Sequence, residues 1–284
     1  MTDNVRLIDT HCHIHDPEFA HSDYTPDQVI ERAVEQGVES LICVGTDVDS
    51  STAAVTFSTA RDRCYAAVAV HPHEAAEMTE QQMQEAANVL EQLIVDDAAA
   101  EARTIVAIGE CGFDYFYHDD PNTHKKQEML LRLHLDLAVK HNMPLIFHVR
   151  DQKNAPADEL GHGFAHFFDV IKDYDGLTGV MHSFSAGLEE MQGAIERGFH
   201  IGLNGIMTFT KDENQLAAAR GVPLEKLVLE TDAPFLTPKP FRGTMCEPKH
   251  VRVTAEFLSE LRGESLQTLS RSTTANAQRL FGIQ

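Results

Sequence analysis

Six short apolar runs along the chain are each followed by side chains that can bind a metal ion or transfer a proton. The first run, residues 5–9, leads into His11 and His13. Successive side chains of a strand point to opposite faces, so these two imidazoles can converge on one point while Cys12 faces away. Imidazole pairs of this kind suit zinc, manganese, nickel or iron. The other five runs end at His71 and His73, Glu110, His148, His182, and Asp232.

These residue types predict a centre that holds two divalent cations. We expect the first histidine pair and Asp232 to hold one cation, and His148 and His182 to hold the other. Two cations about 4 Å apart can activate a shared water and stabilise both the attacking and the leaving oxygen of an ester. Many two-metal hydrolases bridge their cations with a carbamylated lysine, but residues 104–110 contain no lysine. Glu110 is therefore the candidate bridge.

The elements that must position these residues alternate along the chain. Near-continuous apolar strands divided by helical patterns indicate a parallel sheet covered by helices. Eight such units predict an α/β fold, a single-domain (β/α)8 TIM-type barrel over residues 1–284, whose strands meet at one mouth through their carboxyl ends. We expect strands at 5–9, 39–45, 64–70, 104–109, 144–148, 177–182, 199–204 and 227–230, and helices near 26–36, 50–61, 79–98, 122–141, 164–173, 187–197 and 212–220. Further runs at 246–262 and 264–281 finish the chain.

The charge of the chain limits its partners. The formal net charge is −21, with 23 lysines and arginines against 44 acidic residues. Proteins that hold nucleic acid along its backbone neutralise phosphates with lysine and arginine, so extended non-specific binding is not expected. Binding of a single nucleic acid strand end is not excluded by the net charge, because bound divalent cations would add positive charge at the site.

Other features of the composition bear on the compartment. The N-terminus carries no basic-then-apolar signal peptide, and no apolar run approaches the roughly 18 residues of a membrane span. Five cysteines form no Cys-x-x-Cys pair. We therefore expect a cytoplasmic protein with reduced thiols and no membrane contact, either a monomer or a small homo-oligomer.

Longer motifs surround the candidate ligands, in a fixed order over nearly the whole chain. They resemble those of the TatD-type metal-dependent hydrolases (the TatD DNase family), within the wider amidohydrolase superfamily. The segments that carry the resemblance are Asp9–His13, Val70–His73, Ile108–Tyr115, Phe147–Asp151, Met181–Ser185, Leu229–Pro234, Arg242–Gly243, Glu247–Pro248 and Thr274–Phe281.

The resemblance implies an activity as well as a fold. Family members are described as metal-dependent deoxyribonucleases, often 3′-to-5′ exonucleases, and D-aminoacyl-tRNA deacylation has been attributed to relatives. The substrate would be a nucleic acid strand end, contacted by His73 and by Arg150, whose planar fork can hold a phosphate oxygen. Asp232 would orient or deprotonate the attacking water, and Glu110 would share the catalytic role. The implied ligands are His11, His13, Glu110, His148, His182 and Asp232.

Two loops depart from the family pattern. Residues 241–245 read Phe-Arg-Gly-Thr-Met, where close relatives read His-Arg-Gly-Lys-Arg. Arg242 is retained, and we predict that it contacts the substrate. The loop at 154–163 is longer than usual. Both changes weaken the expected affinity for a polynucleotide, in the same direction as the net charge.

Three functions are open on these grounds: a DNA exonuclease, a hydrolase of carboxylic esters or amides such as D-aminoacyl-tRNA or a small molecule, and a metal-binding protein without turnover. The first two would use the same cations. The third is disfavoured because every ligand position is intact. For His71, a structural hydrogen bond and a contact behind the metal ligands are equally expected, while Asp114 and Tyr115 are expected at the rim or in the packing.

Overall fold

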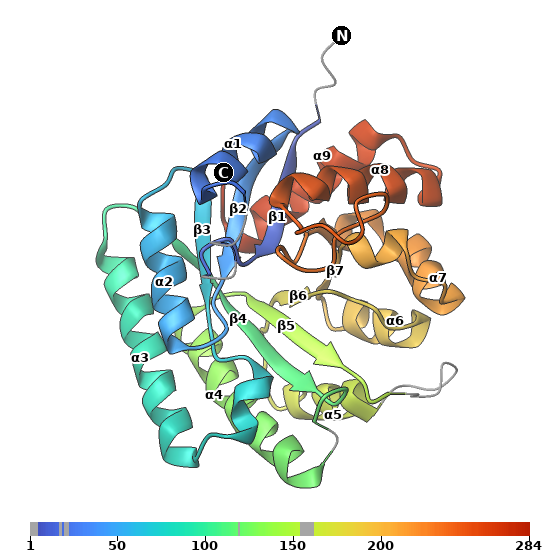
Figure 1. Cartoon of the computed structure of the whole chain (residues 1–284). Coiled ribbons are helices and arrows are strands. Elements are labelled where there is room, and N and C mark those ends of the chain that lie inside the picture. Colours follow the sequence, from blue (N-terminus) through green and yellow to red (C-terminus); the bar gives the residue numbers. More distant parts are fainter. Residues whose placement is uncertain (1–4, 17–18, 20–22, 119, 154–161) are drawn as a thin grey trace.

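The computed structural model describes residues 5–16, 19, 23–118, 120–153 and 162–284. Eight parallel strands follow one another around a barrel in chain order (Figure 1). The predicted (β/α)8 architecture is therefore confirmed. The strands are β1 (Leu7–Cys12), β2 (Val38–Val44), β3 (Cys64–Val68), β4 (Ile105–Asp114), β5 (Leu145–Arg150), β6 (Gly179–Met181), β7 (His200–Leu203) and β8 (Leu227–Leu229).

The barrel closes between β1 and β8 through backbone contacts just beyond their carboxyl ends. Cys12 forms an isolated parallel bridge with Ala233. The His13 N–H donates to the Ala233 carbonyl at 2.7 Å, and the Asp232 N–H donates to the His11 carbonyl at 2.9 Å. These bonds fix the backbone of the first predicted ligand pair beside that of Asp232.

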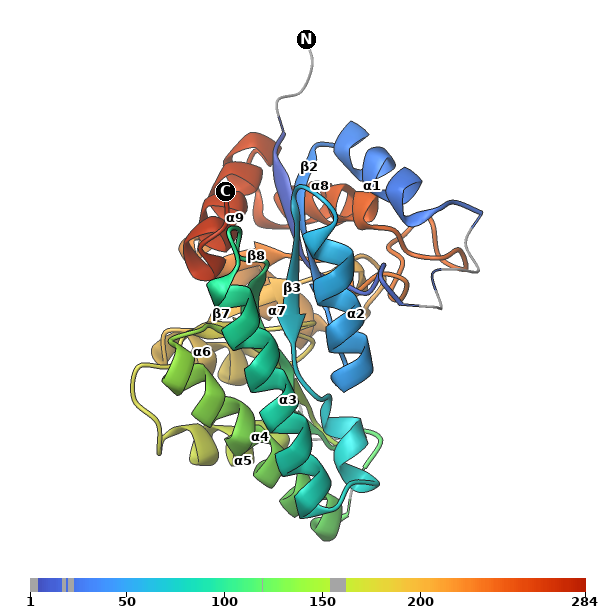
Figure 2. The same cartoon turned by 90° about the vertical axis from the view of Figure 1, so that its left-hand side faces the viewer.

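Helices cover the outside of the barrel (Figures 1 and 2). Capping residues fix where they begin: Thr25 and Gln28 form a capping box at α1, and Thr79 and Gln82 form one at α3. In the described part of the chain, no helix combines the length and the apolar character needed to cross a lipid bilayer. The helices are α1 (Pro26–Glu35), α2 (Val48–Thr59), α3 (Glu80–Ala99), α4 (Pro121–His141), α5 (His162–Ile171), α6 (Leu188–Glu196), α7 (Glu213–Gly221), α8 (Val251–Arg262) and α9 (Leu266–Phe281).

The apolar core has two parts, and the smaller one supports the candidate ligands from below. It joins Ile146, Val180 and Val228 with Phe281 near the end of α9. Along β5, Ile146 precedes His148 by two residues, and side chains two apart on a strand share a face. Val180 and His182 repeat this spacing at β6. The strands thus bury apolar side chains low in the barrel and present imidazoles above them.

Strand β4 is longer than predicted, because it runs through Glu110 to Asp114 instead of ending at residue 109. Glycines at 109 and 112 favour ending a strand, which explains the misplaced boundary. The register shifts between Gly109 and Cys111, so that Glu110 is the extra residue opposite β5. At Gly112, with φ +145°, a Cβ atom would lie 2.1 Å from the His148 carbonyl oxygen. Glycine is therefore what lets β4 pair closely with β5 beside the site.

Candidate metal centre

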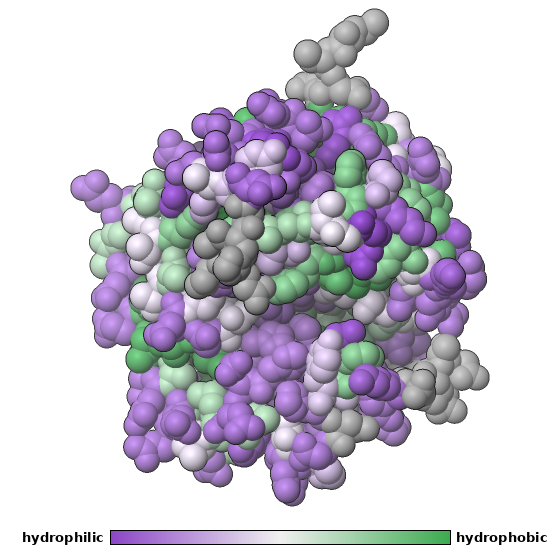
Figure 3. All heavy atoms as spheres, viewed as in Figure 1, coloured by the Kyte–Doolittle hydropathy of each residue, from purple (hydrophilic) through white to green (hydrophobic). Residues whose placement is uncertain are grey.

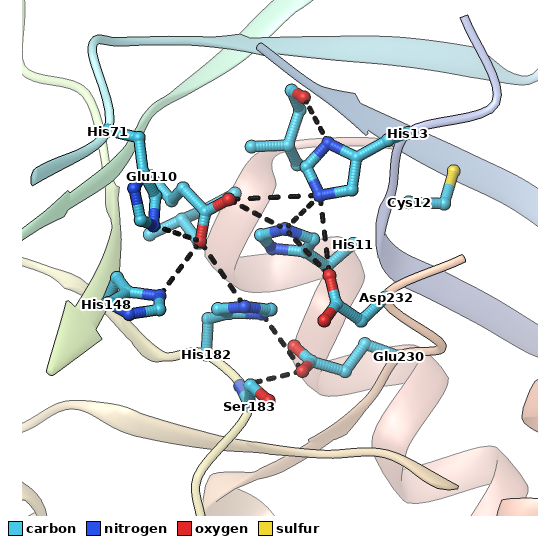
Figure 4. Close-up of polar contacts among 12 residues, drawn as sticks. His11, Cys12, His13, His71, Glu110, His148, His182, Ser183, Glu230 and Asp232 are labelled. Atoms are coloured by element: carbon cyan, nitrogen blue, oxygen red, sulfur yellow. Dashed lines mark hydrogen bonds and ion pairs between the residues drawn. The ribbon is translucent and has the colours of Figure 1, made fainter. Parts of the chain in front are cut away.

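The six predicted ligands meet at the mouth of the barrel, where their side chains point toward one another (Figure 4). Cys12 points away from them, as the alternation along the first strand predicts. His11, Glu110 and His182 are each at most 5% exposed. Buried imidazoles and carboxylates are costly unless they are paired or coordinate a metal, so this donor set fits bound cations.

One group of donors consists of His11, His13 and Asp232. The two Nε2 atoms lie 3.2 Å apart, and Asp232 Oδ1 lies 3.7 Å from the first and 3.4 Å from the second. His13 Nδ1 lies 2.7 Å from the Val44 carbonyl oxygen and donates its proton there, which leaves the Nε2 lone pair facing the group. Two nitrogens bound to one tetrahedral zinc are separated by about 3.3 Å, so the spacing fits a shared cation.

Glu110 lies between the two halves of the centre. Its Oε1 is 3.6 Å from His11 Nε2 and 3.8 Å from His13 Nε2. Its Oε2 is 3.2 Å from His148 Nδ1 and 3.4 Å from His182 Nε2. Each carboxylate oxygen therefore faces a different histidine pair, an arrangement that suits the predicted bridging role.

His71 lies closer to the centre than the sequence indicated. Its Nε2 is 3.8 Å from Glu110 Oε2, and it forms a third donor group with Glu110 and His148. Its Nδ1 accepts the His73 backbone N–H at 3.2 Å, and burial lowers the pKa of the imidazole well below its ordinary value. The neutral ring therefore carries its proton on Nε2, which faces Glu110 at a distance too long for a hydrogen bond. His71 thus makes the structural hydrogen bond that was one of its two expected roles, and it lies beside the predicted ligands.

Two further carboxylates lie behind the predicted ligands, a position that the sequence indicated for neither of them. Glu230 is buried, and its Oε1 lies 3.0 Å from His182 Nδ1 and accepts the Ser183 N–H at 2.7 Å. Asp114, expected at the rim or in the packing, is fully buried and lies 3.1 Å from His148 Nε2. Metal-binding histidines usually donate their second ring nitrogen to such a partner. One feature of the sequence could have indicated both residues: each lies within four positions of a predicted acidic ligand, Glu230 before Asp232 and Asp114 after Glu110.

Charges within the cluster set the protonation of the ligands. Burial by itself would lower the pKa of His13, but Asp232 and Glu110 raise it to about 9. His148 follows the same pattern, with Asp114 and Glu110 raising its pKa to about 9 against the effect of burial. For Glu110, burial opposes ionisation, but the surrounding imidazoles hold its pKa well below the usual range. A cation that binds here must displace protons from these imidazoles.

A cavity of about 1080 Å³ opens above the centre. Figure 3 shows a hollow near the middle of the molecular face in view, with hydrophilic surface in and below it and a hydrophobic band above it. Exposed Tyr117 and Phe235 lie on the cavity wall. Arg150 is the one lysine or arginine among the described lining residues, whereas four acidic side chains form what we call the acidic wall: Asp16, Asp47, Asp49 and Glu74.

The three predicted substrate contacts occupy different places. His73 and Arg150 line the cavity. Arg150 lies 4.0 Å from the ring centre of Phe116, which fixes its guanidinium at the wall. Arg242 is not among the lining residues: it lies over the Phe209 ring at 4.0 Å and donates to the Thr237 carbonyl. Its contact with substrate stays a prediction. Most of the long loop predicted at 154–163 lies outside the described residues.

Comparisons with known proteins agree with this geometry. Residues 8–282 match the family described as TatD related DNase. The chain is 32% identical to the uncharacterized metal-dependent hydrolase YabD of Bacillus subtilis, covering 98% of this chain and 99% of that protein. It is 33% identical to the 3′-5′ ssDNA/RNA exonuclease TatD of Citrobacter koseri, covering 90% and 93%. The crystal structure of the Escherichia coli TatD homolog YjjV superposes with a TM-score of 0.84 at 26% identity, covering 99% of both chains. The chain therefore belongs to the TatD-related DNase family of metal-dependent hydrolases.

Proposed function

We propose that this protein removes nucleotides from the 3′ end of a single DNA strand by metal-dependent hydrolysis of phosphodiester bonds. The observation that carries the proposal is the six-residue donor set at the floor of an open cavity, in which four residues are buried and His148 and Asp232 are partly buried. The family match and the exonuclease name of the Citrobacter koseri relative favour nucleic acid as the substrate class.

The chain offers ligands for two cations. One would be held by His11, His13 and Asp232 and the other by His148 and His182, with Glu110 between them. Bound divalent cations would supply Lewis acidity and a water of lowered pKa. Asp232, whose side chain is 15% exposed and borders the cavity, orients the attacking water and takes up its proton on a carboxylate oxygen.

Groups on the cavity wall orient the strand end. Arg150 can place two N–H donors on one phosphate. Tyr117 is 60% exposed and Phe235 is 49% exposed. Both line the cavity, where aromatic faces can stack on bases without regard to sequence. A terminal nucleotide would thus be held by its phosphate and by its base.

The acidic wall favours a second candidate, D-aminoacyl-tRNA deacylation. Its carboxylates would repel a phosphate backbone running along that side of the cavity. They would instead attract the α-ammonium group of an aminoacyl ester, while Arg150 contacts a phosphate of the tRNA end. The same metal ligands would serve either reaction.

A direct comparison of substrates tests the proposal. The protein is stripped with a chelator, reloaded with zinc or manganese, and given single-stranded DNA labelled at its 3′ or its 5′ end. We expect the 3′ label to leave first as a mononucleotide and the 5′-labelled strand to shorten stepwise. Release of the amino acid from D-aminoacylated tRNA, with no shortening of either DNA, would refute the exonuclease and favour the second candidate.

Two variants make the comparison specific to the metal centre. Glu110→Gln keeps the shape of the side chain and removes its charge, so we expect loss of both bound metal and turnover. Cys12→Ala changes the residue between His11 and His13 that faces away from the site (Figure 4). The Cys12→Ala variant should keep both its bound metal and its activity. Equal loss of metal and activity in Glu110→Gln and Cys12→Ala would mean that the substitutions damage the barrel and do not act on the metal centre alone.

A further inference from the structure

One buried carboxylate contacts both a candidate metal ligand and a candidate substrate contact. Asp114 Oδ2 lies 2.8 Å from His73 Nε2 and 3.1 Å from His148 Nε2. Its Oδ1 accepts the Tyr117 backbone N–H at 3.0 Å. Asp114 has no solvent exposure, so these three donors replace water around the carboxylate.

The contacts fix which nitrogen of each imidazole carries a proton. An ionised carboxylate only accepts hydrogen bonds, so both histidines donate from Nε2. His148 Nδ1 lies 3.2 Å from Glu110 Oε2 and donates a proton there in the metal-free protein. Because Nε2 stays hydrogen-bonded to Asp114, Nδ1 is the nitrogen that a cation would take once it displaces this proton.

The backbone of Asp114 is held in place from α4. Gln127 is fully buried, accepts the Asp114 N–H at 3.2 Å, and donates to the Pro72 carbonyl at 3.2 Å. Pro72 lies between His71 and His73. One glutamine therefore ties the end of β4 to the segment that carries His73, so the two sides of the contact cannot shift independently.

We propose that Asp114 is a positioning residue that couples His73, at the substrate-facing wall, to His148 in the metal centre. The His73 side chain is 35% exposed and lines the cavity. An anionic group that binds His73 changes the hydrogen bond to Oδ2, and the same oxygen orients His148. Binding of substrate and binding of metal are then linked, and the linkage acts equally in both directions. This inference rests on the metal-dependent hydrolysis proposed above.

The first test uses Asp114→Asn in the full chain and measures binding of cobalt(II) to the metal-free protein, together with the visible spectrum of the cobalt form. We expect roughly 10- to 100-fold weaker binding, the effect typical of losing a partner behind a metal ligand, and a changed spectrum. The matched control is Asp97→Asn. Asp97 is a buried carboxylate in the last turn of α3, and it accepts the Thr104 and Ile105 N–H groups at the start of β4, the end of the strand opposite to Asp114. The Asp97→Asn variant should leave the cobalt affinity and the visible spectrum unchanged.

A second variant keeps the coupling testable if Asp114→Asn does not fold. His73→Ala removes a partly exposed side chain that is not a predicted ligand, yet it should weaken cobalt binding by roughly 5-fold or more. In the double variant, the effect on substrate KM should be smaller than the product of the single effects, because both changes break one contact.

The outcomes separate this inference from the metal centre itself. Unchanged cobalt affinity and spectrum in both Asp114→Asn and His73→Ala would overturn the coupling while leaving the metal centre intact. Independent effects on KM in the double variant would also overturn it. Failure of the unaltered protein to bind cobalt, zinc or manganese would overturn the metal centre and this inference with it.

Discussion

Acidification should destabilise the fold through His134, a buried residue on α4 that supports the site from outside the metal centre. Its Nε2 accepts the Val70 N–H at 3.0 Å, and its Nδ1 donates to the Leu130 carbonyl at 2.8 Å. The neutral ring is thus fully satisfied, and burial lowers its pKa from 6.5 to about 4. Val70 directly precedes His71, so protonation of this ring would disturb the segment that carries His71 and His73.

The magnitude follows from the linkage between protonation and folding. Above pH 6.5 the ring is neutral in both folded and unfolded chains, so the stabilisation is complete. Between pH 6.5 and about 4 the unfolded chain takes up a proton that the folded chain does not, and stability falls as the pH falls. Each pKa unit corresponds to about 1.4 kcal/mol, so the contribution lost is about 3.4 kcal/mol.

Urea unfolding followed by circular dichroism, at intervals between pH 7 and 4 on metal-free protein, measures this loss. The control is His134→Gln, which keeps an acceptor for the Val70 N–H but does not titrate. Because other buried histidines titrate in both proteins, the quantity of interest is the difference between their unfolding free energies. We expect the advantage of the unaltered protein to shrink by about 3 kcal/mol between pH 7 and 4, because the folded ring is already half protonated at pH 4. Parallel curves for the two proteins would refute the reasoning.

Three further predictions concern the site. Glu110→Ala should abolish turnover and lower the metal content measured by elemental analysis; full activity with unchanged metal would contradict the bridging role. Arg150→Ala should raise KM roughly 10- to 100-fold, because a hydrogen bond to a charged group contributes about 1.5–3 kcal/mol, while metal content stays normal; loss of metal would place Arg150 among the ligands instead. Glu230→Gln should weaken metal binding about 10- to 100-fold through His182, and equal affinity in isothermal titration would count against that role.

The charge pattern of the cavity bears on which ester is cleaved. The acidic wall and the single lining arginine among the described residues agree in direction with the net charge of −21. A strand end can enter such a cavity, but a long phosphate backbone would meet repulsion on the acidic side. A longer single-stranded overhang places more phosphates against the acidic wall. We therefore expect nuclease activity to weaken as the length of the overhang increases.

The candidate ligand positions could be predicted from the sequence because their signals are local. An apolar run followed by His11 and His13, or by His182, fixes both the strand and the face of its side chains through a two-residue period. The eight-fold alternation then requires the carboxyl ends to meet at one mouth. For Glu110 the residue was identified but the strand boundary was wrong, because pairing with β5 outweighs the tendency of Gly109 and Gly112 to end a strand.

The sequence by itself determined the barrel, the six candidate ligands and their order around the mouth. Only the tertiary structure decided which groups stand behind those ligands: Asp114 behind His148, Glu230 behind His182, and His71 beside Glu110. It also placed Arg242 over the Phe209 ring, with a hydrogen bond to the Thr237 carbonyl. The physical reason is that these contacts join residues from different strands and loops. Their distances depend on the register of the sheet and on loop conformation, which no local pattern in the chain records.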